Sequence, residues 1–146
     1  MLVAHDLWKP KAPSPPPTKP AAIIKPVGGM KLSAADVIVV LCVVPADFDS
    51  AKLARTLVER SLAACVQSGP EVTSTYRWKG VVETSAEKLV LIKTRSALFG
   101  AVERAIRKVH PYDVPEIIAL PVVAGHAPYL GWVSAETTSR PGSPEE

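Results

Sequence analysis

The sequence predicts an α+β domain with a four-stranded sheet, on the evidence of three patterns. Residues 37–44 are all apolar, mostly β-branched, and end at Pro45, which is typical of a central strand. The segments after Asp49 and after Ser96 repeat apolar residues at helical spacing. Between them lie two extended arms separated by Lys79-Gly80, which suits a hairpin turn. The predicted order is β-α-β-β-α-β, the split β-α-β arrangement called ferredoxin-like.

Each helix should begin at a polar cap. Asp47 or Asp49 is expected to cap the first helix, and Ser96 the second. The apolar face of the first helix is Leu53, Ala54, Leu57, Val58 and Leu62. That of the second is Leu98, Ala101, Val102, Ala105, Ile106 and Val109.

The two arms, about residues 64–78 and 81–94, form the second and third strands. The first arm is broken at Gly69-Pro70, which indicates an edge strand with a bulge. The second becomes wholly apolar at residues 89–92 and should be central there. Right-handed crossovers place the first strand beside the third and fourth, with the second strand at an edge.

The arms are longer than a small sheet needs. Strands typically have about 5–6 residues, whereas each arm has about fourteen, so their outer halves would project as exposed edges. Pairing with other copies of the chain would cover these edges, which predicts a closed cyclic oligomer. Tyr76 and Trp78 on the arm, together with Trp132, are the expected interface residues.

The stretch from His110 to Pro121 is where we expect a site. Pro111 should end the second helix, and the turn then carries His110, Tyr112, Asp113 and Glu116. A buried fourth strand is predicted over about residues 116–123. A short helix over about residues 127–136 follows, and its Tyr129, Leu130 and Trp132 are expected to pack against the rest of the domain.

The ends of the chain differ from this domain, which we place at residues 35–138. Residues 1–34 hold seven of the fifteen prolines and five lysines against one aspartate, so a disordered, solvated extension is predicted. We expect residues 1–29 to be dispensable, with Met30 as an alternative start. Residues 139–146 should fray. No signal peptide or membrane span is recognisable, which predicts a cytoplasmic protein without membrane or nucleic-acid partners.

Several function classes are excluded by missing residues. The central strands lack the aromatic residues of RNA-recognition modules, and no Cys-x-x-Cys loop follows the first strand. Asparagine is absent from the chain, which excludes an acylphosphatase-like site. There is no P-loop, no G-x-S-x-G elbow and no recognisable nucleophile–base pair, so no enzymatic activity is expected.

The sequence resembles the CutA family of divalent-cation tolerance proteins over about residues 36–138. The motifs that carry the resemblance are Leu41-Cys42-x-x-Pro45, Leu62-Ala63-Ala64-Cys65-Val66, Tyr76-x-Trp78-x-Gly80, Ile92-Lys93-Thr94, His110-Pro111-Tyr112-x-x-Pro115-Glu116-Ile117 and Tyr129-Leu130-x-Trp132. The resemblance implies a ferredoxin-like homotrimer with interlocking hairpins, a role in heavy-metal tolerance, and copper binding without a defined reaction.

The resemblance also implies metal ligands. In some family members copper binding involves the cysteine of the first strand and paired histidines before the Pro-Tyr. Cys42 and His110 match, whereas Val109 occupies the place of the other histidine. Soft thiolate and imidazole ligands suit copper. Copper(II) or another divalent cation is the expected ion, and no organic cofactor is expected. Against this, a cysteine in an apolar strand commonly serves core packing, and a histidine at a helix end commonly interacts with that end.

A polar cleft between subunits is the expected ligand site, lined by Lys93, Tyr112 and Glu116. Cys42 and Cys65 should lie on non-neighbouring strands and form no disulfide. One alternative remains open, a trimeric nucleotide sensor like the PII signalling proteins. Phosphate binding would require clustered glycines, which the folded part lacks, so the sequence favours the metal-related function.

Overall fold

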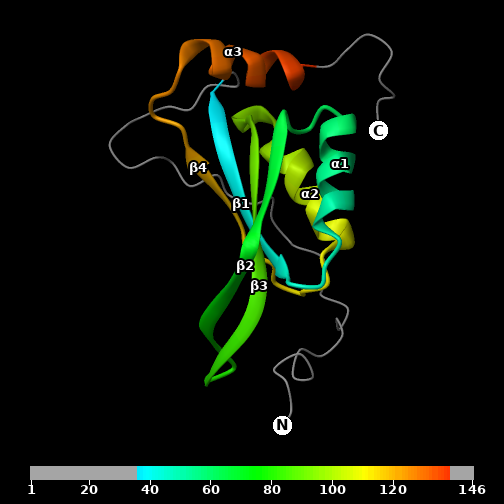
Figure 1. The fold of residues 1–146 in the computed structure, drawn as a ribbon, viewed down its shortest axis with the longest axis vertical. Coiled ribbons are helices and arrows are strands. Elements are labelled where there is room, and N and C mark those ends of the chain that lie inside the picture. Colours follow the sequence, from blue (N-terminus) through cyan, green and yellow to red (C-terminus); the bar gives the residue numbers. More distant parts are fainter. Residues whose placement is uncertain (1–35, 139–146) are drawn as a thin grey trace.

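The computed structural model describes residues 36–138, which form one antiparallel sheet and three α-helices (Figure 1). The elements are β1 (Val37–Pro45), α1 (Ser50–Glu59), β2 (Cys65–Trp78), β3 (Val81–Arg95), α2 (Phe99–Val109), β4 (Ile117–Pro121) and α3 (Ala127–Glu136). The strand order is β2-β3-β1-β4. The predicted placement is confirmed: β1 lies between β3 and β4, and β2 is at an edge. The predicted extension 1–34 and tail 139–146 lie outside the described residues.

Helices α1 and α2 cover one face of the sheet (Figure 1). Because side chains of a strand alternate between faces, every second residue of β1 faces these helices. The core contains Ile38, Val40, Cys42 and Val44 of β1, Val90 and Ile92 of β3, Leu53 and Leu57 of α1, and Val102 and Ile106 of α2. The predicted helical faces therefore pack as expected near their centres. At their margins the prediction is wrong, since Val58 is 43% and Val109 52% exposed.

The opposite face of the sheet is covered only at one end in the described part of the chain. There α3 crosses the sheet, and Val133 packs with Val37 and Ala64. Arg95 fixes the end of this helix by donating from Nε to Thr137 Oγ1 at 2.9 Å and from Nη2 to the Thr137 carbonyl oxygen at 2.6 Å. None of the helices in residues 36–138 has the length and apolar character needed to span a bilayer.

The β2–β3 hairpin extends well beyond the helices (Figure 1). Its turn is Lys79-Gly80, as predicted, with φ of 49° and 81°. Positive φ at both positions matches the two-residue turn whose twist suits a hairpin. The register shifts between Ser68 and Glu71, which confirms the predicted bulge at Gly69-Pro70.

The two helix starts behave differently. The Asp49 side chain accepts a hydrogen bond from the Lys52 N–H at 3.1 Å and caps α1, as one of the two predicted candidates. The prediction for Ser96 is wrong: a 3-10 turn, Ser96–Leu98, intervenes, and α2 begins at Phe99 without a side-chain cap. The Ser96 N–H instead donates to the Asp36 carbonyl oxygen at 2.8 Å, which holds Ser96 at the end of the sheet.

The fourth strand is shorter and more exposed than predicted. It covers five residues and pairs only with β1, so its outer side has no neighbour in the described chain. Ile118 is 45% and Leu120 48% exposed, because no helix covers the face they occupy. The predicted bounds of α3 are confirmed, but Val133 is its buried residue, while Tyr129 and Trp132 are more than 40% exposed.

Candidate functional site

The turn after α2 is anchored by the ring of His110. Pro111 follows the end of α2, as predicted, and the His110 N–H donates to the Ile106 carbonyl oxygen at 2.9 Å. The ring is 3% exposed. Its Nε2 lies 2.7 Å from the Val43 carbonyl oxygen, and its Nδ1 accepts from the Tyr112 N–H at 3.1 Å. A neutral ring with its proton on Nε2 satisfies both bonds.

Tyr112 joins this turn to the base of the hairpin. Its ring centroid is 4.8 Å from that of His110, and its hydroxyl donates to Glu87 Oε2 at 2.9 Å. Glu87 belongs to β3 and is 6% exposed. Burial, followed by the hydrogen bond to Glu87, raises the pKa of Tyr112. The turn is therefore fixed to β1 through His110 and to β3 through Tyr112.

Cys42 lies fully buried between the sheet and the helices. Burial, reinforced by the negative charges of Glu116 and Glu87, raises the pKa of its thiol from 9.0 to about 12. Since the thiolate is the metal-binding form, this environment favours core packing. Cys65 is half-buried at the start of β2, and both cysteines are free. The predicted placement of Cys42 and Cys65 on non-neighbouring strands is confirmed, because β3 lies between β1 and β2.

The predicted copper ligands do not form an open metal site within one chain. Both ring nitrogens of His110 are engaged, and the Cys42 thiol is shielded from solvent. Val109, in the place of the second histidine, is largely exposed. Within residues 36–138, no three His, Cys, Asp or Glu side chains are grouped so that they could hold a metal ion. These residues alone do not fit a resident copper ion.

The three residues predicted to line a cleft are not all neighbours. Glu116 is exposed next to the start of β4 and acts electrostatically on Cys42, as Glu87 does. Lys93 pairs in register with Val39 and Cys65, and its Nζ donates to Gln67 Oε1. Lys93 is six residue steps along β3 from Glu87, a distance of about 20 Å. A single chain therefore keeps Lys93 away from Tyr112.

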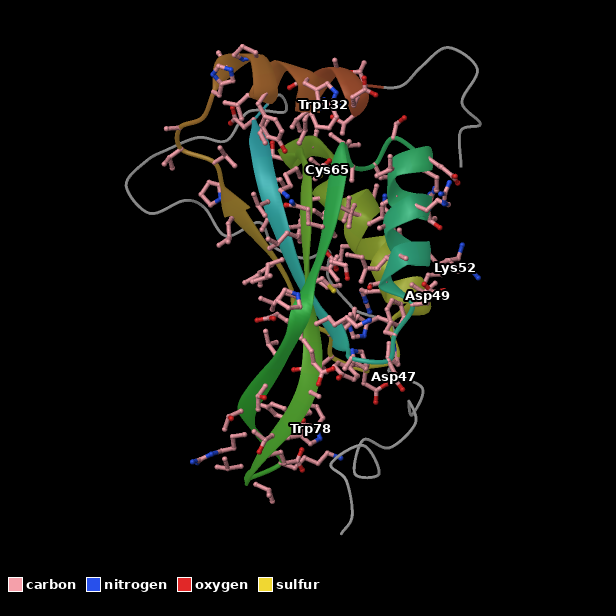
Figure 2. All side chains as sticks on the ribbon, viewed as in Figure 1. Asp47, Asp49, Lys52, Cys65, Trp78 and Trp132 are labelled. Carbon is pink, nitrogen blue, oxygen red and sulfur yellow. The ribbon has the colours of Figure 1, made fainter. Side chains whose placement is uncertain are left out.

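The predicted interface residues occupy two ends of the molecule. Trp78 is 37% exposed near the hairpin turn, with Lys79 Nζ 6.0 Å from its ring centroid, and Tyr76 is half-buried on the same strand. Trp132 is 43% exposed on α3, with its ring centroid 5.6 Å from that of Tyr129. Figure 2 shows Trp78 and Trp132 at opposite ends of the described chain.

Sequence reasoning missed Glu87. Strand alternation places Glu87 on the same face of β3 as Leu89 and Leu91, because successive side chains point to opposite faces. A carboxylate on this otherwise apolar face was the signal in the sequence that could have marked Glu87 as a candidate site residue. Only the folded turn shows that Tyr112 reaches it.

A sequence profile described as CutA1 divalent ion tolerance protein matches residues 38–136. Protein CutA of Homo sapiens is 43% identical over 124 residues, which cover 85% of this chain and 68% of the human protein. The divalent-cation tolerance protein CutA of Thermus thermophilus is 43% identical over 99 residues, 68% of this chain and 96% of that protein. The crystal structure of CutA1 from Oryza sativa matches with a TM-score of 0.68 at 41% identity, covering 72% of this chain and 96% of that one. The chain belongs to the CutA1 divalent ion tolerance family.

Proposed function

We propose that the protein is a homotrimer of ferredoxin-like subunits that contributes to divalent-cation tolerance by binding cations in clefts between subunits. The observation that carries the proposal is the uncovered sheet face. Ile118 and Leu120 are nearly half exposed there, and Val81 and Val82 at the hairpin turn are 57% and 61% exposed. Exposed apolar groups of this kind, on a projecting hairpin and a free strand edge, are typical of an interface between copies.

The position of the aromatic residues supports a ring. Trp78 and Trp132 are at opposite ends of one chain, so a contact that uses both brings different surfaces of two copies together (Figure 2). Such a head-to-tail contact closes into a ring when the rotation between copies is suitable. The same arrangement would bring Lys93 of one subunit toward Tyr112 and Glu116 of the next, which a single chain cannot do.

The cation in these clefts is copper(II) or another divalent ion, bound weakly, with no organic cofactor and no catalysis. Cys42 and His110 stay predicted ligands, but they lie inside one subunit rather than in these clefts and would have to give up their present internal contacts to bind. We place the protein in the cytoplasm. Its relatives vary in this respect, because the CutA proteins of rice and Arabidopsis thaliana are named chloroplastic and one Archaeoglobus fulgidus structure is titled periplasmic.

Sedimentation equilibrium tests the assembly, and calorimetry tests the ligand. The full chain should sediment with three times the mass of one chain, and a well-behaved monomer would disprove the proposal. Titration with Cu(II), Zn(II) and ATP should give heat with the metal ions only. Tight ATP binding without a metal response would instead support the PII-like nucleotide sensor.

A further inference from the structure

The uncovered face of the sheet carries opposite charges toward its two ends. Side chains at odd-numbered positions of β3 point to this face, because the even-numbered ones pack against the helices. Lys93 leaves it at the end that α3 covers, where its carbonyl oxygen accepts from the Ala64 N–H and Ala64 packs with Val133. Glu87 leaves the same face at the base of the hairpin. The two residues are about 20 Å apart along β3, so one chain cannot pair these two charges.

Apolar side chains fill this face between the two charges. They come from β1, β3 and β4, and all are half-buried or exposed: Val39, Leu41, Leu89, Leu91, Ile118 and Leu120. A second copy that covers these side chains also removes water from the charges at either end of them. Because a charge taken out of water without a counter-charge is unfavourable, such an interface needs an opposite charge at each end.

Neither charge has an ionic partner in the described part of the chain. Lys93 is half-buried, and its Nζ donates to the neutral amide of Gln67, which leaves further ammonium protons for a carboxylate. Glu87 is 6% exposed and accepts through Oε2 from the Tyr112 hydroxyl at 2.9 Å. Its Oε1 has no hydrogen-bond partner in the described chain. This atom still reaches the surface, since the one buried side-chain atom without a partner there is Ser85 Oγ.

Neighbouring groups strengthen the sign of each end. Glu116 and Asp47 act electrostatically on groups at the hairpin end, as Glu87 does. Arg95 lies at the other end, where it bonds to the last turn of α3. A face that is positive at one end and negative at the other binds a copy of itself when ends of opposite sign meet. This polarity favours a second copy of the chain as the partner of both charges.

We propose that Nζ of Lys93 in one subunit donates to Oε1 of Glu87 in the next, and that this ion pair fixes the relative position of the two copies. The inference rests on the proposed assembly and names the residues that determine its geometry. The apolar side chains between the two charges supply attraction without direction, because hydrophobic contact is non-directional. An ion pair at the margin of the contact selects one arrangement, since any other leaves two charges covered and unpaired.

Subunit exchange between full chains labelled with a fluorescence donor and with an acceptor measures this pair. Glu87→Gln removes the charge and can still accept from Tyr112, and Lys93→Met removes the charge and keeps most of the apolar stem. Each change should raise the exchange rate at least about ten-fold, because losing one partner of a buried charge pair acts on dissociation. Both changes together should exceed the faster single variant by no more than about two-fold, since the second removes nothing further. Glu71→Gln and Lys52→Gln, at exposed positions away from this face, are the matched controls and should exchange like the unaltered chain.

Exchanging the two charges gives a second test that places no neutral residue at either position. Glu87→Lys and Lys93→Glu should each raise the exchange rate more than the neutral change at the same position, because like charges then meet. The chain with both reversals should return to within about ten-fold of the unaltered rate. Circular dichroism identifies a variant that does not fold, and Lys93→Met alone decides the question if the changes at Glu87 prevent folding.

The mass of the oligomer separates this pair from the proposed trimer. Additive effects of Glu87→Gln and Lys93→Met, or an unchanged exchange rate in either, would overturn the pair while a trimer of the unaltered chain stands. A dimer in which the two changes are coupled would disprove the trimer and support the pair. An unaltered chain that sediments as a monomer would disprove both.

Discussion

The two halves of β3 have the same backbone conformation and opposite environments. Residues 87–95 all pair with β1 and most of them also pair with β2, and Val90, Ile92 and Thr94 are fully buried. Residues 81–86 pair only with β2, and Val81 and Val82 are mostly exposed. The inner half is thus stabilised by the core of its own chain, whereas the outer half depends on cross-strand pairs and on contacts with other copies. Stability and assembly should therefore respond to different substitutions along one strand.

The largest expected effect on stability is at Ile92. Ile92→Ala removes a fully buried side chain from the layer between sheet and helices and should lower the free energy of unfolding by about 2–5 kcal/mol. Urea unfolding at fixed protein concentration measures this loss. Thr84→Ala, at an exposed polar position on the outer half, is the control and should change stability by less than about 0.5 kcal/mol. Equal losses at the two positions would remove the distinction between the halves.

Trp78→Ala should have the largest effect on assembly. Loss of a buried interface tryptophan commonly weakens association by about 2 kcal/mol or more, while the core of the single chain should stay folded. Light scattering and circular dichroism follow the two properties separately. Thr75→Ala, an exposed position on the other face of β2, serves as the control. An unchanged oligomer in Trp78→Ala would contradict the assignment of this end of the hairpin to the interface.

Cys42→Ala should lower the free energy of unfolding by about 1–3 kcal/mol, as expected for trimming a small core residue. The effect should depend on pH. The thiol pKa rises from 9.0 to about 12 on folding, so its contribution is present below about pH 9 and is lost as the pH rises toward 12. The urea midpoint of unfolding should therefore decrease less between pH 8 and pH 10.5 in Cys42→Ala than in the unaltered chain. Abolished copper affinity with unchanged stability would show that Cys42 is a ligand instead.

The smallest expected effect is at the junction of the two halves. Tyr112→Phe removes the hydroxyl that donates to Glu87 and should lower the free energy of unfolding by about 1 kcal/mol. Hydrogen exchange should show faster opening of the turn after α2, because Tyr112 connects it to β3. Tyr129→Phe, at an exposed position, should leave both measurements unchanged. Unaltered exchange in Tyr112→Phe would mean that His110 alone fixes the turn.

Most of the fold could be predicted because its signals are local. The apolar run of β1, the Lys79-Gly80 turn and the break at Gly69-Pro70 each determine nearby backbone structure. The start of α2 was not predictable in this way, because the Ser96 N–H bonds to Asp36, a residue distant in sequence. The exposure of Ile118 was not predictable either, because it depends on the absence of a helix over that face of β4 in the described chain. A run of apolar residues has the same sequence pattern in a strand buried within one chain and in a strand at an interface.

The candidate site was predicted less completely than the fold. His110 and Tyr112 were found from the turn that carries them, and the structure joins them through one hydrogen bond. Their partner Glu87 was missed because its contact depends on register and on the path of the turn. The grouping of Lys93 with Tyr112 is predicted for a cleft between subunits and stays a prediction, since within one chain Lys93 lies about 20 Å along β3 from Glu87, the partner of Tyr112.

The bulge in β2 determines the direction of the hairpin. Gly69 and Pro70 are absent from the register, so β2 can bend there while β3 continues its pairing with β1. A Cβ atom at Gly69 would approach the Leu89 carbonyl oxygen to 3.3 Å, which ties the bend to a residue without a side chain. A change at this dipeptide would re-aim the whole arm and alter the radius of any ring built from it, while the hydrophobic interior keeps its packing.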